Sequence, residues 1–144
     1  MVLLDTHLVS ELRKAKSGKA HPGVTAWATG VLPASLYLSA ITILELETGI
    51  LRVERRDAAQ GSLLRTWFDG HVLPAFAGRI LPVDTAIAQC CARLQVPDPR
   101  SDRDALIAAT AIVHGMTIVT RNVLDFEPTG VALLNPWQAP RDET

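Results

Sequence analysis

The segment SDRDALIAATAIVHGMTIVTRNVLDF, residues 101–126, decides how the rest of the chain is interpreted. Its first half is apolar at nearly every position, which predicts a helix that is buried on most sides. A tight turn follows, and the short apolar run 116–119 predicts a buried strand. An acid stands near each end of the segment, Asp104 and Asp125. If the helix packs beside its own strand, both carboxylates reach the same edge of a sheet.

Short apolar strands and helices alternate along the chain on both sides of this segment. This alternation predicts a parallel sheet covered on both faces, which is a three-layer α/β/α sandwich with a short central sheet. No repeat or linker divides the sequence, so we expect a single domain over residues 1–144 with a frayed tail from about 139 to 144. We expect strands at 2–4, 36–39, 79–83, 116–119 and 131–134, and helices at 6–16, 22–30, 41–53, 57–76 and 84–94 as well as after residue 101.

The composition is that of an ordinary globular protein. The chain has 144 residues, 48% of them hydrophobic and 20% charged, and a net charge of -1, so no overall basic field indicates a nucleic-acid partner. Cys90 and Cys91 are adjacent, which disfavours a disulfide between them, and they lack the companions of a zinc site. No apolar run is long enough to span a bilayer, and Asp5 comes too early for a signal peptide. We therefore expect a cytoplasmic protein with no membrane partner.

Four acids occupy positions that suit a site, although each also has a structural explanation. Asp5 ends the first strand, where it could form an Asx turn or cap the helix for which Thr6 is another candidate cap. Glu45 lies in the apolar helix 41–53, and periodicity alone does not favour it over Glu47. Asp104 also fits a capping box with Ser101, four residues that read Ser-x-x-Asp. Asp125, in the loop TRNVLDF, would mean little as an isolated turn residue.

Carboxylates gathered at one sheet edge would have a definite chemical consequence. They would repel one another, and their pKa values would rise unless a cation neutralised them. Oxygen ligands without His or Cys favour Mg²⁺, with Mn²⁺ as an alternative. A cation held in this way activates water and neutralises the charge that builds up on a phosphate during transfer. That is the chemistry of a nuclease.

Three blocks of the sequence, in this order and spacing, resemble the PIN domain family. They are DTHLVSEL at 5–12, SAITILELETGI at 39–50 and DALIAATAIVHGMTIVTRNVLDFEPTGVALLNPW at 104–137. Within the family they are most similar to the VapC-type toxins of type II toxin–antitoxin systems, in particular the FitB-like branch. The resemblance implies a magnesium-dependent endoribonuclease in which metal-activated water attacks an RNA phosphodiester.

The resemblance also implies roles for individual residues. The catalytic and metal-binding acids of the family match Asp5, Glu45, Asp104 and Asp125. The resemblance therefore favours Glu45 over Glu47. Positions beside the site are matched by Thr6, His7, Thr120 and Asn122. One departure concerns His7, because the first block is commonly DTNxxSE. We expect His7 to donate a hydrogen bond to a neighbouring carboxylate rather than to change the metal.

Partners follow from the same resemblance. It implies a cognate VapB-type antitoxin, an RNA substrate and a homodimer, with a heterotetramer or larger assembly when the antitoxin is bound. The helices over 23–32 and 41–64 are where we expect the antitoxin and the second subunit. Basic residues expected to guide RNA phosphates are Lys14, Lys16, Arg52, Arg55 and Arg56.

Two other interpretations are open at this point. A degenerate PIN domain that only binds partners would keep the fold, and His7 is the one hint of it. An unrelated flavodoxin-like protein would use a phosphate loop after the first strand, but DTHLVSE has no glycine there.

Overall fold

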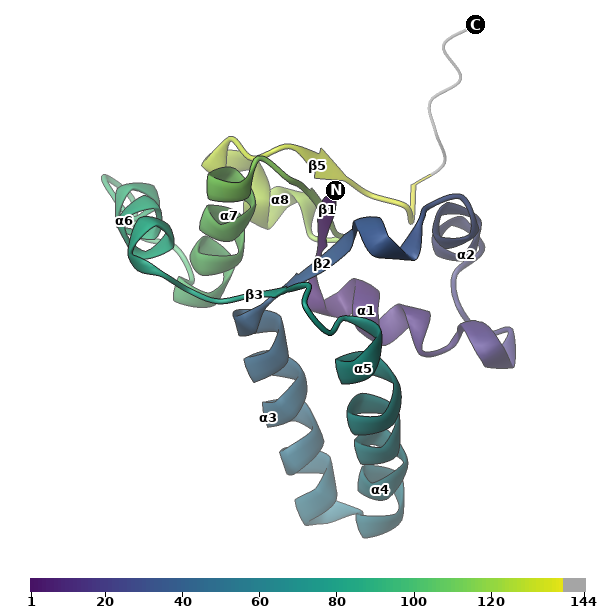
Figure 1. Cartoon of the computed structure of the whole chain (residues 1–144). Coiled ribbons are helices and arrows are strands. Elements are labelled where there is room, and N and C mark those ends of the chain that lie inside the picture. Colours follow the sequence, from purple (N-terminus) through teal and green to yellow (C-terminus); the bar gives the residue numbers. More distant parts are fainter. Residues whose placement is uncertain (139–144) are drawn as a thin grey trace, which may run out of the picture.

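The fold is a parallel sheet covered by helices, as the sequence predicts (Figure 1). A computed structural model describes residues 1–138, and the predicted frayed tail lies outside this range. The five strands are all parallel and are ordered β3-β2-β1-β4-β5. Their bounds are β1 Val2–Leu4, β2 Leu36–Ser39, β3 Ile80–Leu81, β4 Thr117–Val119 and β5 Leu133–Leu134.

The helices follow the predicted alternation with the strands. The α-helices are α1 Thr6–Leu12, α2 Pro22–Thr29, α3 Ala40–Arg56, α4 Ala58–Trp67, α5 Leu73–Ala75, α6 Thr85–Leu94, α7 Asp102–His114 and α8 Val123–Phe126. Short 3-10 turns lie at Ala15–Ser17, Pro33–Ser35 and Glu127–Thr129, and a π-helical turn lies at Phe68–Val72. Within residues 1–138 no helix is long and apolar enough to cross a membrane.

The pleat of the central strand divides the core between the two faces of the sheet. Leu3 packs with Ile107 and other residues of α7, whereas Leu4 packs with Leu8 of α1 and with residues of α2 and α3. Successive strand side chains point to opposite faces, so β1 contributes to both clusters. The face with Leu4 is covered by α1 to α5 and the face with Leu3 by α7 and α8, while α6 packs on α7 through Cys90 and Ala109. These are the three layers of the predicted sandwich.

Some boundaries differ from the sequence prediction. The helix expected over 6–16 ends at Leu12, and its N-cap is Asp5, whose side chain accepts a hydrogen bond from the Thr6 N–H, so Thr6 is not the cap. The strand expected over 79–83 keeps only Ile80–Leu81, because Pro82 has no N–H to donate to a neighbouring strand. The strand expected over 131–134 likewise keeps only its last two residues.

The helix expected over 57–76 is present, but it is not α-helical throughout. The π-helical turn Phe68–Val72 separates α4 from α5. Pro74 explains the change, because its ring would collide with the carbonyl four residues earlier in a regular α-helix. The wider π turn relieves this collision without ending the helix.

Candidate active site

The candidate site lies at the carboxyl edge of the sheet, where chain connections diverge. Strands β2 and β3 lie on one side of β1, and β4 and β5 lie on the other. Ligands of open parallel sheets bind at such a switch point, outside the carboxyl ends of the strands. Asp5 follows β1 directly and Thr120 follows β4, so residues 115 positions apart meet here.

Asp5 is the most firmly positioned acid of the site. Only 4% of its surface is exposed. One carboxylate oxygen accepts from the Thr6 N–H at 2.8 Å, and the other accepts from the Thr120 hydroxyl at 2.8 Å. The Thr120 oxygen in turn accepts from the Asn122 N–H at 2.9 Å. This chain of hydrogen bonds fixes the Asp5 carboxylate and the start of the loop after β4 relative to each other.

Glu45 and Glu47 have different environments on α3. Glu45 Oε1 accepts a hydrogen bond from the Thr6 hydroxyl at 2.8 Å, which places Glu45 beside Asp5. Both oxygens of Glu47 accept from Nη1 of Arg65 on α4, at 2.8 and 2.9 Å. Glu47 is therefore already neutralised by a neighbouring helix, whereas Glu45 is directed toward the site.

Asp104 stands at the start of α7 and faces the other acids. The Ser101 hydroxyl caps this helix by accepting a hydrogen bond from the Asp104 N–H at 3.5 Å. This is the serine interaction of the predicted capping box. The Asp104 side chain lines the site instead. Its pKa is raised, first by burial and then by the negative charges of Asp5, Asp125 and Glu45.

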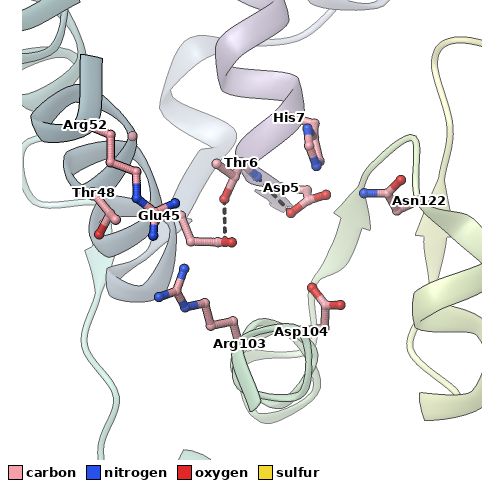
Figure 2. A pocket seen from close by; sticks show the side chains of 10 residues that line it. Asp5, Thr6, His7, Glu45, Thr48, Arg52, Arg103, Asp104 and Asn122 are labelled. Carbon is pink, nitrogen blue, oxygen red and sulfur yellow. Dashed lines mark hydrogen bonds between the residues drawn. The ribbon is translucent and has the colours of Figure 1, made fainter. Parts of the chain in front are cut away.

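These side chains line one pocket of about 260 Å³ (Figure 2). Asp5 and Asp104 face one another across it, and Arg52 and Arg103 extend toward Glu45 from two different helices. Asn122 lies on the side of the pocket away from Arg52. The full lining is Asp5, Thr6, His7, Glu45, Thr48, Gly49, Arg52, Arg103, Asp104 and Asn122.

The remaining predicted residues lie outside this pocket. Asp125 is exposed on α8 and lines a neighbouring cavity, and its negative charge contributes to the raised pKa of Asp104, so its part in the site stays a prediction. Lys14 lines another adjoining cavity. Lys16, Arg55 and Arg56 are exposed but are not part of the acidic pocket.

Arg103 and Thr48 are site residues that the sequence interpretation did not identify. Arg103 directly precedes Asp104 in the first turn of α7, and Thr48 lies three residues after Glu45 on α3. Residues three apart on a helix share a face, so the position of Thr48 follows once Glu45 is placed. Arg103 had no comparable signal, because its direction depends on how α7 packs.

The oxygen atoms that line the pocket suit a divalent metal ion. The pocket offers carboxylate, hydroxyl and amide oxygens, which are the ligands that Mg²⁺ and Mn²⁺ prefer. The pKa of Asp104 is raised by burial and then by the negative charges of Asp5, Asp125 and Glu45, and a cation would offset these charges. Among residues 1–138, however, no three His, Cys, Asp or Glu side chains are already spaced to hold a metal. The chemistry of the pocket fits the ion, and the spacing requires the carboxylates to turn inward.

Comparison with known proteins adds independent information to this geometry. A family model described as "PIN domain" matches residues 2–125, which is most of the chain. The chain belongs to the PIN domain family. The matched residues contain every acid of the candidate site and strands β1 to β4, and they end before β5.

Individual relatives extend the similarity over almost the whole chain. The PIN domain is 39% identical to the VapC ribonuclease Y4jK of Sinorhizobium fredii, over 96% of this chain and 99% of that protein. It is 34% identical to the toxin FitB of Neisseria gonorrhoeae, over 95% of this chain and 99% of that protein. The crystal structure of FitAcB from the same organism superposes with a TM-score of 0.86, at 33% identity, and covers 96% of this chain and 100% of that one.

Proposed function

We propose that this PIN domain is an endoribonuclease toxin of a type II toxin–antitoxin system and that it depends on Mg²⁺ or Mn²⁺. The observation that carries the proposal is the pocket in which Asp5, Glu45 and Asp104 face one another with no Lys or Arg bonded to any of them among the described residues. The similarity to proteins named as a VapC ribonuclease and a toxin supports the substrate class.

The proposed roles of the residues follow from their contacts. Asp5, Glu45 and Asp104 would hold the divalent cation, and Asp125 would act from the adjoining cavity on the charge of Asp104. When bound, the cation would supply charge neutralisation at the phosphate and activation of water. Thr6 and Thr120 hold the carboxylates of Glu45 and Asp5 in place through the hydrogen bonds described above. The hydrogen bond expected from His7 to a carboxylate is not among those of residues 1–138, so we assign His7, together with Asn122, to the substrate.

Arg52 and Arg103 are suited to a phosphate. Both line the acidic pocket, and their side chains extend toward it from α3 and α7 (Figure 2). A guanidinium binds phosphate oxygens through paired N–H groups, which positions the backbone of a substrate. We therefore assign RNA binding at the pocket to these two arginines, with Lys14 at its margin. The more distant Lys16, Arg55 and Arg56 would contribute only to the general attraction of RNA.

The assembly is also part of the proposal. Relatives have been crystallised as toxin–antitoxin complexes, including a FitAB complex bound to DNA that superposes with a TM-score of 0.87 at 33% identity. We infer that this chain is likewise inhibited by a cognate VapB-type antitoxin and acts in the cytoplasm, where its RNA substrate lies. Homodimers and larger antitoxin complexes are the expected assemblies.

Substitution of Asp5 tests the proposal. Asp5→Asn keeps the size of the side chain and removes its charge, so we expect RNA cleavage to fall by about a hundredfold or more, together with loss of growth arrest and of Mg²⁺ binding measured by calorimetry. Asp98→Asn, in the exposed loop before α7, is the matched control and should cleave normally. Full cleavage by Asp5→Asn would refute the metal-site model. A folded wild-type chain that binds neither Mg²⁺ nor Mn²⁺ would instead indicate the degenerate binding module.

A further inference from the structure

A second cavity adjoins the acidic pocket between α1 and the loop that follows β4. Its volume is about 430 Å³, and it shares His7 and Asn122 with the acidic pocket. The other lining residues are Ser10, Glu11, Lys14, Arg121 and Trp137. Because two residues belong to both cavities, a chain-like ligand that crosses the acidic pocket passes His7 and Asn122 and enters this second cavity directly.

Arg121 lies over the ring of Trp137 in this cavity, and we call this stacked pair the Arg121–Trp137 platform. The guanidinium carbon of Arg121 lies 5.9 Å from the centre of the Trp137 ring, which is a cation–π distance. Trp137 is anchored, because its ring packs partly against the core and its backbone N–H donates to Asn135 Oδ1 at 2.9 Å. Arg121 is exposed and takes part in none of the ion pairs found among residues 1–138. Its charge is therefore available to a ligand.

Lys14, by contrast, has a partner already. Its Nζ lies 3.2 Å from Glu11 Oε2, and the other oxygen of Glu11 accepts from the His21 N–H at 2.9 Å. The pKa of Glu11 is lowered, first by the hydrogen bond from the His21 backbone and then by the hydrogen bond from the Lys14 ammonium group. The charges of Glu11 and Lys14 nearly cancel, which leaves Arg121 as the principal cation of the cavity.

We propose that this cavity binds the nucleotide next to the scissile phosphate of a single-stranded RNA, with its base on the Arg121–Trp137 platform. The proposal rests on the proposed ribonuclease function and adds a subsite to it. Aromatic and guanidinium planes stack on bases, and hydroxyl, amide and imidazole groups such as those of Ser10, Asn122 and His7 bind base edges and the 2′-hydroxyl. The proposal also assigns a role to His7, which stands where the family commonly has Asn and which lines both cavities.

RNA affinity in an uncleaving background is the direct test. In an Asp5→Asn protein, fluorescence anisotropy of a labelled single-stranded RNA should show binding weakened about 5- to 150-fold by Trp137→Leu. Arg121→Gln should weaken binding because it removes the guanidinium plane on which the base stacks, and it should lower the slope of log affinity against log salt by at most about 0.7, the value for one neutralised phosphate. Arg93→Gln, at an exposed position on α6, is the matched control and should change neither quantity.

Because Trp137 packs partly against the core, thermal unfolding must first establish that Trp137→Leu is folded. An RNA that lacks a single base provides a second measurement. Removal of the base next to the cleavage position should weaken RNA binding to the Asp5→Asn protein that retains Trp137. It should have little further effect on RNA binding to the variant that also carries Trp137→Leu.

The proposal is overturned if both variants bind RNA as Arg93→Gln does, or if the base-free RNA binds as tightly as the intact one. Cleavage of the same RNA by the wild-type chain with Mg²⁺ tests the proposed function separately. A chain that cleaves RNA but is indifferent to Trp137 and Arg121 contradicts only the subsite.

Discussion

The crowding of carboxylates around Asp104 has a consequence for stability. Burial and the charges of Asp5, Asp125 and Glu45 raise the pKa of Asp104 in the folded chain, so the folded state binds this proton more tightly than the unfolded state. Stability therefore falls as the pH rises through the interval between the ordinary and the raised pKa, and it stays lower above that interval. A bound cation would remove this cost.

We predict that Asp104→Asn stabilises the metal-free protein at neutral pH. In EDTA its melting temperature should exceed that of the wild type by about 1–3 °C at pH 7, because a partly solvated carboxylate is screened. The difference should shrink as the pH falls through the raised pKa of Asp104, because the wild-type carboxyl group then takes up its proton. Asp98→Asn should show no such trend. A wild type that melts above Asp104→Asn at pH 7 without metal would contradict the repulsion.

Thr120 offers a second test, because it connects strand β4 to the buried Asp5. Thr120→Val keeps the shape but removes the donor to Asp5 Oδ2 and the acceptor for the Asn122 N–H. Loss of a partner for a buried charged group costs about 1–3 kcal/mol, and chemical denaturation should report a loss of that size. RNA cleavage should fall as well, since Asp5 loses its fixed position. Unchanged stability would show that water replaces the hydroxyl.

The pair of helices α3 and α4 shows how one element serves the site. Arg65 of α4 bonds to Glu47 and also to Glu54, with Nη2 lying 3.0 Å from Glu54 Oε1. These bonds, Glu54 first and then Glu47, raise the pKa of Arg65 further above its ordinary value. The cluster ties α4 to the face of α3 that carries Glu47, which leaves the face with Glu45, Thr48 and Arg52 to line the pocket.

Because α3 and α4 approach each other closely at Gly61, an added methyl group there should destabilise the fold. A Cβ atom at Gly61 would lie 2.5 Å from the Glu54 Cα, so Gly61→Ala must push the helices apart. We expect a loss of about 1–3 kcal/mol in denaturant unfolding. Gly70→Ala is the matched control, because nothing lies within 4 Å of its Cβ and alanine favours helix, so it should be neutral or slightly stabilising. Equal effects of the two substitutions would contradict the contact.

For the whole molecule, α3 presents an apolar stripe to the outside. Leu44 and Leu51 are 47% and 54% exposed, and a spacing of seven residues places them on one side of the helix. The sequence prediction places the second subunit or the antitoxin on this helix. Two exposed leucines on one side of a helix agree with an interface there, since exposed apolar surface marks sites of association.

We therefore predict that the double substitution Leu44→Ser with Leu51→Glu converts a dimer into a monomer. Light scattering after size-exclusion chromatography measures the change, and circular dichroism checks that the fold remains. Leu124→Ser, at an 82% exposed position on α8, is the control and should leave the assembly unchanged. A dimer that persists in the double variant places the interface elsewhere.

Much of this architecture follows from local patterns in the sequence. The apolar runs, the Asp84 cap of α6 and the buried helix α7 all agree with the structure, because strand and helix periods and caps depend on neighbouring residues. The family motifs likewise indicated which acids to examine. The ends of the short strands were less predictable, since Pro82 and the pairing partners decide them.

Only the tertiary structure decided how the side chains meet. The rotation of α3 against α4 directs Glu45 into the pocket and Glu47 to Arg65, although both acids lie on the same apolar helix. The packing of α7 brings Arg103 to Glu45, and the position of α8 moves Asp125 into an adjoining cavity. The meeting of Arg121 with Trp137 likewise depends on how the segment after β5 returns beside β4. Local sequence determines elements, whereas distances between elements depend on packing over the whole fold, and the chemistry of the pocket depends on those distances.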